Sequence, residues 1–149
     1  MGFLDTLNVS ASGMTAERLR MDVIANNLAN ANTTRTAEGG PYRRQMVVFA
    51  PASGGSSFAD ALAGAQGDSS NAGQGVQVQA IVPDNSPLKR IYEPGHPDAD
   101  AQGYVSMPNV DTVTEMVDMM SATRAYEADV TAVNAVKAMA QKALEIGKA

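Results

Sequence analysis

Residues 110–146, VDTVTEMVDMMSATRAYEADVTAVNAVKAMAQKALEI, contain neither proline nor glycine and decide what kind of fold this chain can form. Alternating steps of three and four residues in this stretch fall mostly on apolar side chains, at Met116, Met119, Thr123, Tyr126, Val130, Val133, Lys137, Ala140 and Leu144. This spacing is typical of a helix that packs along one stripe against another helix. We therefore expect one long helix over residues 110–146.

A matching stripe lies at the other end of the chain. Between residues 3 and 31 the same steps fall on Leu4, Leu7, Ala11, Met14, Arg18, Met21, Ala25 and Leu28, and Arg18 alone is polar. We expect the two terminal helices to form a coiled-coil-like pair. At about 1.5 Å per residue they would be roughly 43 and 55 Å long, which is more than a small globule needs. Part of each apolar face is therefore expected to pack against other chains.

The residues between the two stripes break helices. All seven prolines and ten of the thirteen glycines lie between residues 39 and 108, so this region is expected to form strands and turns. Runs of β-prone residues predict four short strands, at 42–49, 76–82, 88–92 and 104–107. We expect them to form one antiparallel sheet of three or four strands. Residues 52–75 are rich in Gly, Ser, Ala, Asn and Gln and predict a long mobile loop.

These patterns together predict an α+β fold in three consecutive parts. The first part, residues 1–34, is the N-terminal helix. The second, residues 35–108, is the β-rich middle region, which contains the flexible loop 52–75. The third, residues 109–149, is the C-terminal helix.

The beginning of the C-terminal helix carries signals of its own. Pro108 ends the preceding strand, and Asn109 offers a side-chain acceptor to the backbone N–H groups that follow. Thr112 and Glu115 stand three residues apart, as the partners of a capping box do. We therefore expect Glu115 to reach back to the start of its own helix.

Composition excludes several classes of function. The formal net charge is −5 and the 11 basic residues are scattered, so the chain is not expected to bind nucleic acid. The chain has no cysteine and a single histidine, His96, which excludes thiolate metal sites and histidine triads. The N-terminal residues lack the basic leader of a signal peptide, and nowhere do about 18 apolar residues follow one another. We expect neither a cleaved signal peptide nor direct membrane insertion.

One acidic turn resembles part of a metal-binding loop. Asp98, Asp100, Gln102 and Gly103 follow the opening of a calcium loop, but the twelfth position is Asn109, where a bidentate glutamate is required. The same carboxylates lie in a Pro/Gly-rich turn, without the apolar surroundings that shift pKa values at catalytic sites. No catalytic, cofactor-binding or metal site is therefore expected, and the chain is not expected to be an enzyme.

The two apolar stripes have other interpretations. They could form an ordinary intramolecular core, which the spacing alone does not distinguish from an interface between subunits. They could also lie on a membrane surface, but their polar faces carry acids as often as bases, and they contain Met, Ala and Val rather than Trp and Phe. Packing of helix against helix is therefore favoured.

Residues 24–33, IANNLANANT, resemble the signature that ends the N-terminal helix of flagellar rod and hook proteins. Ser12-Gly13-Met14 and Arg20 precede this stretch in the same order as in those proteins. The C-terminal run that includes Glu115-Met116-Val117, Arg124-Ala125-Tyr126 and Lys142-Ala143-Leu144 is also similar to that family. Within it the chain looks like a proximal rod protein, because its length leaves no room for the large outer domains of hook proteins.

The resemblance and the stripes together nominate residues that contact other subunits. The asparagines of the signature are carried over from the family, and amide side chains there can cap helix carbonyls and bond neighbouring subunits. The expected interface residues are Leu7, Met14, Met21, Asn26, Asn27, Leu28, Asn30, Asn32, Met116, Met119, Arg124, Tyr126, Val130, Val133 and Leu144. Arg35-Thr36 replaces the Gly-Phe step of many relatives.

The resemblance implies a structural subunit of the proximal rod of the flagellar basal body. Such a subunit is exported by the flagellar type III apparatus without leader cleavage and assembles in the periplasm into a torque-transmitting tube. The implied partners are other copies of the chain, other rod proteins, and basal-body components at the rod base, including the membrane (MS) ring. The alternatives are a different rod or hook-junction subunit and a small periplasmic or surface enzyme.

Overall fold

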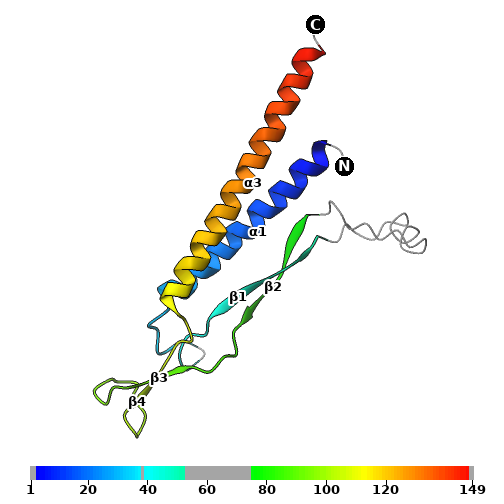
Figure 1. Ribbon diagram of the computed structural model, residues 1–149. Coiled ribbons are helices and arrows are strands. Elements are labelled where there is room, and N and C mark those ends of the chain that lie inside the picture. Colours follow the sequence, from blue (N-terminus) through cyan, green and yellow to red (C-terminus); the bar gives the residue numbers. More distant parts are fainter. Residues whose placement is uncertain (1–2, 38, 53–74, 148–149) are drawn as a thin grey trace, which may run out of the picture. The chain divides into compact units, whose positions relative to one another are not determined.

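The computed structural model describes residues 3–37, 39–52 and 75–147 (Figure 1). Its elements, in chain order, are α1 (Phe3–Ala29), β1 (Gln45–Pro51), β2 (Val76–Pro83), β3 (Lys89–Tyr92), β4 (Tyr104–Met107) and α3 (Thr112–Ile146). Two long helices therefore enclose a small antiparallel β region in sequence, which confirms the predicted α+β class. Residues 53–74, most of the predicted mobile loop, lie outside the described residues.

The chain divides into two compact units, and α1, β1, β2 and α3 each contribute to both. The terminal unit comprises Met1–Arg18, Phe49–Gln79 and Arg124–Ala149, and the central unit comprises Leu19–Val48 and Ala80–Thr123. In the central unit the Oγ1 atom of Thr123 lies 3.6 Å from the Sδ atom of Met21, and Asn27 bonds to Glu115. The α1 and α3 segments of this unit therefore run antiparallel.

β1 and β2 form a two-stranded sheet. At one end the N–H of Asp84 donates to the carbonyl of Arg44 (2.7 Å), and at the other the N–H of Ala52 donates to the carbonyl of Gly75 (3.0 Å). These two bonds make the pair antiparallel. Residues along β1 alternate between half-buried and exposed up to Phe49, as expected for a strand with one covered face.

β3 and β4 form a second antiparallel pair, in which Lys89 lies opposite Met107. The expected single sheet of three or four strands is therefore wrong, since the strands of the described ranges pair two by two. Pro83 ends β2 and has no N–H with which to continue a ladder. Directly after it, the Oδ1 atom of Asp84 accepts hydrogen bonds from the N–H and the hydroxyl of Ser86 (2.8 and 2.6 Å), which turns the chain before β3.

The covered face of α1 differs from the predicted stripe. The residues of α1 that are buried within the chain are Ala16, Val23, Ile24 and Asn27. Ala16 and Val23 follow Met14 and Met21 of the predicted stripe by two residues, which corresponds to about 200° around a helix. The stripe residues Leu4 and Leu28 remain 69% and 38% exposed. The interpretation as an ordinary intramolecular core is therefore wrong for most of this stripe.

The covered face of α3 is displaced from its predicted stripe by one residue. Glu115, Ala122 and Val136 are buried, whereas the predicted neighbours Met116, Thr123 and Lys137 are exposed. The predicted members that do become half-buried are Met119, Tyr126, Val130, Val133 and Ala140. An apolar pattern could not identify this register because a glutamate occupies its first buried position.

The start of β2 packs tightly against α1 in the terminal unit. The hydroxyl of Ser12 donates to the carbonyl of Val9 (2.6 Å) and accepts a hydrogen bond from the N–H of Val76 (3.0 Å). Gly75 has a φ of +79°, and a Cβ atom built on it would overlap the hydroxyl of Ser12. This position therefore requires glycine both for its backbone conformation and for its close approach to the helix.

Replacement of Gly75 should reveal these two requirements. We expect Gly75→Ala to lower the free energy of unfolding by roughly 2–3 kcal/mol, because the left-handed backbone and the lost Ser12 hydrogen bond both contribute. Gly40→Ala is the matched control, since Gly40 has a φ of +80° but no atom within 4 Å of a Cβ. It should cost about 1–2 kcal/mol in urea denaturation. Equal losses for the two variants would contradict the close packing of Ser12 and Gly75.

Candidate assembly interface

α3 begins at a cap that differs from the predicted one. The Oδ1 atom of Asp111 accepts hydrogen bonds from the N–H groups of Val113 (3.0 Å) and Thr114 (3.4 Å). The predicted capping box of Thr112 and Glu115 is therefore wrong, because the aspartate side chain one residue earlier already accepts from these N–H groups. Glu115 is released from this role and turns into the central unit.

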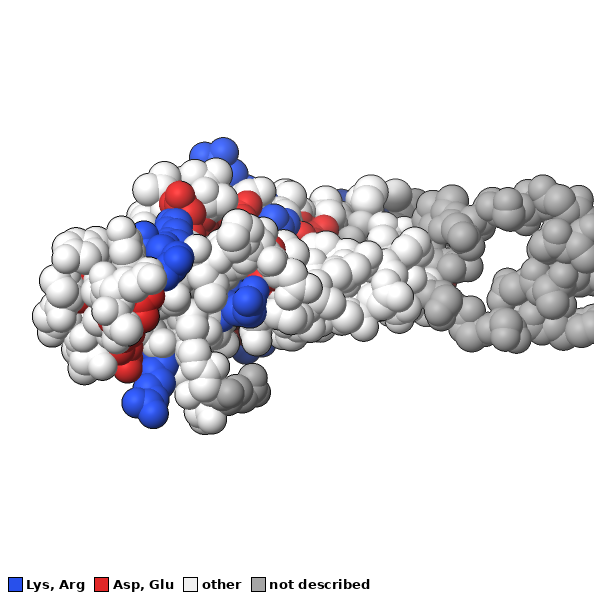
Figure 2. Space-filling view, turned by 90° about the horizontal axis from the view of Figure 1, so that it is seen from below, with Lys and Arg blue, Asp and Glu red and all other residues white. Residues whose placement is uncertain are grey.

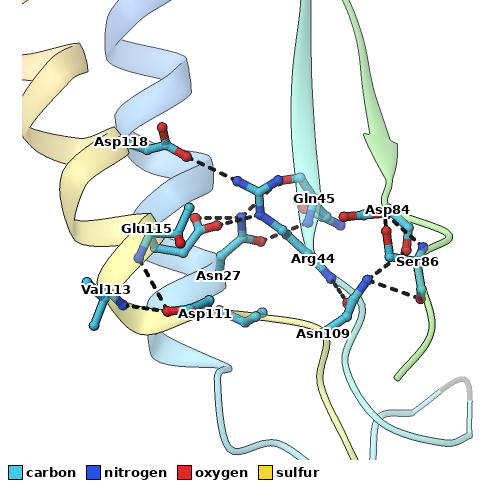
Figure 3. Close-up of polar contacts among 12 residues, drawn as sticks. Asn27, Arg44, Gln45, Asp84, Ser86, Asn109, Asp111, Val113, Glu115 and Asp118 are labelled. Atoms are coloured by element: carbon cyan, nitrogen blue, oxygen red, sulfur yellow. Dashed lines mark hydrogen bonds and ion pairs between the residues drawn. The ribbon is translucent and has the colours of Figure 1, made fainter. Parts of the chain in front are cut away.

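The carboxylate of Glu115 is fully buried and joins three segments of the chain (Figure 3). Its Oε2 atom accepts a hydrogen bond from Nδ2 of Asn27 on α1 (3.0 Å), and its Oε1 atom accepts a short one from Nε of Arg44. The same guanidinium reaches Asp118 one turn further along α3 (3.1 Å). A buried carboxylate is costly unless it is paired and hydrogen-bonded, and here both conditions are met.

Asn27 is the second centre of this buried network. Its Oδ1 atom accepts hydrogen bonds from the N–H of Gln45 and the hydroxyl of Tyr42, both at 2.9 Å. Its Nδ2 atom donates to the carbonyl of Gln45 (2.8 Å) and to Glu115. Both donors and both lone pairs of the amide are thus used within the chain. Asn27 is 1% exposed and belongs to the core of the central unit, so its expected role as a surface contact needs correction.

The network continues through Arg44 and Asn109. The N–H of Arg44 donates to Oδ1 of Asn109 (2.9 Å), whose Nδ2 donates to the carbonyl of Asp84 (3.1 Å). Burial by itself would lower the pKa of Arg44, but the hydrogen bond and charge of Glu115 outweigh it, so the pKa is raised. Burial and the nearby Glu115 charge also raise the pKa of Tyr42. The guanidinium and the phenol therefore stay in their protonated forms.

The other asparagines of the signature lie at the end of α1. Nδ2 of Asn30 donates to the carbonyl (2.9 Å) and to Oδ1 (2.8 Å) of Asn26, and Oδ1 of Asn30 accepts from the hydroxyl of Thr33 (3.2 Å). The carbonyl of Asn26 therefore receives two donors from Asn30, because it also accepts the backbone N–H of that residue (3.1 Å). Asn26 and Asn32 are exposed and Asn30 is half-buried.

The remaining predicted interface residues fall into two groups. Half-buried in the chain are Leu7, Met14, Met21, Met119, Tyr126, Val130 and Val133. Exposed are Leu28, Met116, Arg124 and Leu144, with 56% of Met116 and 69% of Leu144 accessible. The structure therefore leaves surface on every one of these residues, in contrast to Asn27.

Sequence reasoning nominated only Met116 from an exposed apolar surface on α3 in the central unit. It consists of four α3 residues that are each 54–69% exposed and that we call the α3 apolar patch: Val113, Met116, Val117 and Met120. Their spacing of i, i+3, i+4 and i+7 places them on one face of the helix, away from Glu115 and Ala122. That spacing could have been read from the sequence, but the stripe that included Met116 drew attention to a neighbouring face.

Charged side chains are arranged in pairs rather than in a single-sign surface. On the face shown in Figure 2, Lys and Arg lie beside Asp and Glu. Arg90, for example, bonds to Asp100 at 2.8 Å. The backbone N–H of Tyr104 (2.9 Å), that of Gln102 (2.8 Å) and Arg90 together lower the pKa of Asp100. Asp100, the second carboxylate of the calcium-like motif, thus holds the turn between β3 and β4.

The side chains around this turn stabilise one another. Oδ2 of Asp98 accepts a hydrogen bond from the hydroxyl of Thr34 (2.8 Å). The rings of Tyr92 and Tyr104 meet edge to face with centroids 5.2 Å apart, and the guanidinium of Arg90 lies 5.2 Å from the Tyr104 centroid. In the part of the chain that the structure describes, no three acidic or histidine side chains are grouped to hold a metal ion. Within the same residues, neither helix combines the length and apolar character that a membrane crossing requires.

Removal of the buried carboxylate should destabilise the central unit. We expect Glu115→Ala to lower the free energy of unfolding by roughly 3–5 kcal/mol, because Arg44 and Asn27 lose their buried acceptor. Glu127→Ala on the exposed side of α3 should change it by less than about 0.5 kcal/mol. Urea denaturation of the purified chain measures both. Similar small effects of the two substitutions would show that Glu115 does not hold the three segments together.

Comparison with known proteins places this arrangement in a family. Residues 7–35, which include most of α1, match the family model of the flagella basal body rod protein, and residues 101–146 match that of the flagellar basal body rod FlgEFG protein C-terminal region. The chain is 54% identical to the flagellar basal-body rod protein FlgC of Bacillus subtilis, with 96% of this chain and 97% of the relative aligned. It is 49% identical to FlgC of Borreliella burgdorferi (98% of each) and 43% identical to FlgC of Escherichia coli O157:H7 (99% and 100%). The chain therefore belongs to the FlgC family of flagellar basal-body rod proteins.

Proposed function

We propose that this chain is a subunit of the proximal rod that polymerises through α1 and α3 into a torque-transmitting tube. The observation that carries the proposal is the α3 apolar patch, because four large apolar side chains on one helix face remain more than half exposed in the single chain. Contiguous exposed apolar surface of this kind marks sites of protein association. The relatives are rod proteins of the basal body. In a rod, neighbouring subunits would cover such a surface.

Burial of this surface would favour assembly. Full burial of one Val or Met side chain contributes about 1.5–3 kcal/mol. The four half-exposed residues of the patch can therefore contribute several kcal/mol at each contact, from which the loss of translational and rotational freedom must be subtracted. Since every copy carries the same patch, the gain is repeated along the tube.

The buried network gives the patch a fixed support. Glu115 lies in the first turn of α3, next to Met116, and connects this part of the helix to α1 and to Arg44, which directly precedes β1. The patch is thus presented on a helix whose position is set inside the same unit. A pre-organised surface loses less conformational entropy when it binds.

The export route, location and partners of the chain follow from the same proposal. The flagellar type III apparatus would export the chain without leader cleavage, and the chain would assemble in the periplasm with other copies and other rod proteins above the membrane (MS) ring. The surfaces retained by Leu7, Met14, Leu28, Val130 and Val133 would contact neighbouring subunits. Asn26, Asn30 and Asn32 would add uncharged hydrogen bonds at the end of α1. The role is mechanical, in agreement with the structural rod proteins to which the chain is related.

The alternative is a different flagellar axial protein, such as another rod or hook-junction subunit. Such proteins share the terminal motifs of this chain. Alignment with FlgC relatives over 96–99% of the chain favours the FlgC position over that alternative.

A charge in the α3 apolar patch should separate folding from assembly. Met116 is exposed in the single chain, so Met116→Asp should change the free energy of unfolding by less than about 1 kcal/mol. In the tube the same carboxylate would be buried among apolar side chains without a partner. We therefore expect soluble, folded protein but no rods and no swimming in cells that lack their own copy, as measured by basal-body isolation and motility.

Asn134→Asp is the matched control, because it adds an acid at an exposed position of α3 outside the patch. It should preserve both rods and swimming. Normal rods built from the Met116→Asp chain would contradict the proposal that this patch is covered by other subunits.

A further inference from the structure

The terminal unit contains a groove of about 570 Å³ between its helices and strands. Five of its ten lining residues have side chains no larger than a methyl group, which leaves room for the backbone of another helix to approach closely. These residues are Gly13, Ala16, Gly75, Ala125 and Ala128. Phe49 and Val76 supply an apolar floor.

One wall of the groove carries a negative charge. Asp129 is half-buried there, and a Cβ atom built on Gly13 would lie 2.5 Å from its Oδ2 atom. No basic side chain among the described residues forms an ion pair with Asp129. An occupant of this groove should therefore combine a narrow apolar face with a cation.

The opposite face of α1 has this combination. Leu4, Ala11 and Arg18 are exposed along it, and Leu7 and Met14 are half-buried between them. Arg18 likewise makes no ion pair with a described residue. Ala11 and Met14 precede the groove residues Gly13 and Ala16 by two, which corresponds to about 200° around the helix.

We propose that the groove of the terminal unit receives the exposed face of α1 from a second copy of this chain, with Arg18 of one copy paired with Asp129 of the next. Leu7, Ala11 and Met14 then lie against the small residues of the groove. The inference rests on the proposed function, in which copies of the chain polymerise. The pairing of Arg18 with Asp129 is the reason that this face of the second copy is expected to enter the groove.

The position of the two surfaces determines the kind of assembly that results. The groove and the α1 face lie on opposite sides of one helix within one unit, so each copy can bind one neighbour on each side. Such a contact is heterologous, and repetition of a heterologous contact builds rings or open helical filaments rather than closed twofold dimers. A tube of rod subunits requires a contact of this kind.

Disulfide cross-linking between copies tests the contact directly, because the chain has no cysteine of its own. Two forms, Met14→Cys and Ala128→Cys, are produced together in cells that lack their own copy, and isolated basal bodies are oxidised. We expect a dimer that contains one chain of each form. Asn134→Cys, on the side of α3 away from the groove, replaces Ala128→Cys as the control and should give no such dimer. The inference would be overturned if intact basal bodies gave no dimer between residues 14 and 128. It would also be overturned if residue 134 cross-linked equally well, or if the cysteines cross-linked to a different protein.

Charge reversal provides a second test that needs no cysteine. Arg18→Glu and Asp129→Lys should each lower the number of assembled basal bodies by roughly tenfold, the effect of one lost ion pair in a partly buried setting. The double variant should restore assembly to within about twofold. If the double variant assembles no better than the single ones, the pairing is wrong. Failure of the proposed function would differ from both results, since the unsubstituted chain would then be missing from isolated basal bodies.

Discussion

The burial of one carboxylate constrains the central unit of this protein. Glu115 has no access to solvent, so its charge must be balanced by Arg44 and its second oxygen by Asn27. Asn27 comes from α1 and Arg44 directly precedes β1, and Asn27 in turn bonds to the backbone of Gln45 on both its N–H and its carbonyl. The positions of α1, β1 and α3 in this unit are therefore mutually dependent. Apolar residues of the same volume could stabilise the unit as well, but they would fix its register less strictly.

This internal arrangement determines what remains on the outside. The covered helix faces combine small and polar residues with a few branched apolar ones such as Val23 and Ile24, whereas other large apolar residues such as Met116 and Leu4 stay exposed. Exposed apolar side chains that gather on one helix face indicate association with another molecule. In the proposed assembly, one face of each helix packs within its own chain and another face packs against other subunits.

Sequence patterns predicted the elements of this fold better than their faces. The absence of proline and glycine located α3, and the β-prone runs located all four strands. The buried face of α3 was predicted one residue away from its actual position, because helical periodicity favours burial of the apolar Met116 over burial of Glu115. In the structure, pairing with Arg44 makes burial of the glutamate favourable. The family signature drew attention to Asn27 but suggested contacts between subunits. Its internal role depends on Tyr42 and Gln45, which no short-range pattern connects to it.

Amide hydrogen exchange of Arg44 and Gln45 in the full chain measures whether the buried network around Glu115 holds the central unit together. The N–H groups of these residues donate to the side chains of Asn109 and Asn27. If the buried network holds the central unit together, both amides should be protected with the same opening free energy as the helix amides around Asn27 and Glu115. Exchange of Arg44 and Gln45 at the rate of exposed loop amides, while those helix amides stay protected, would contradict it.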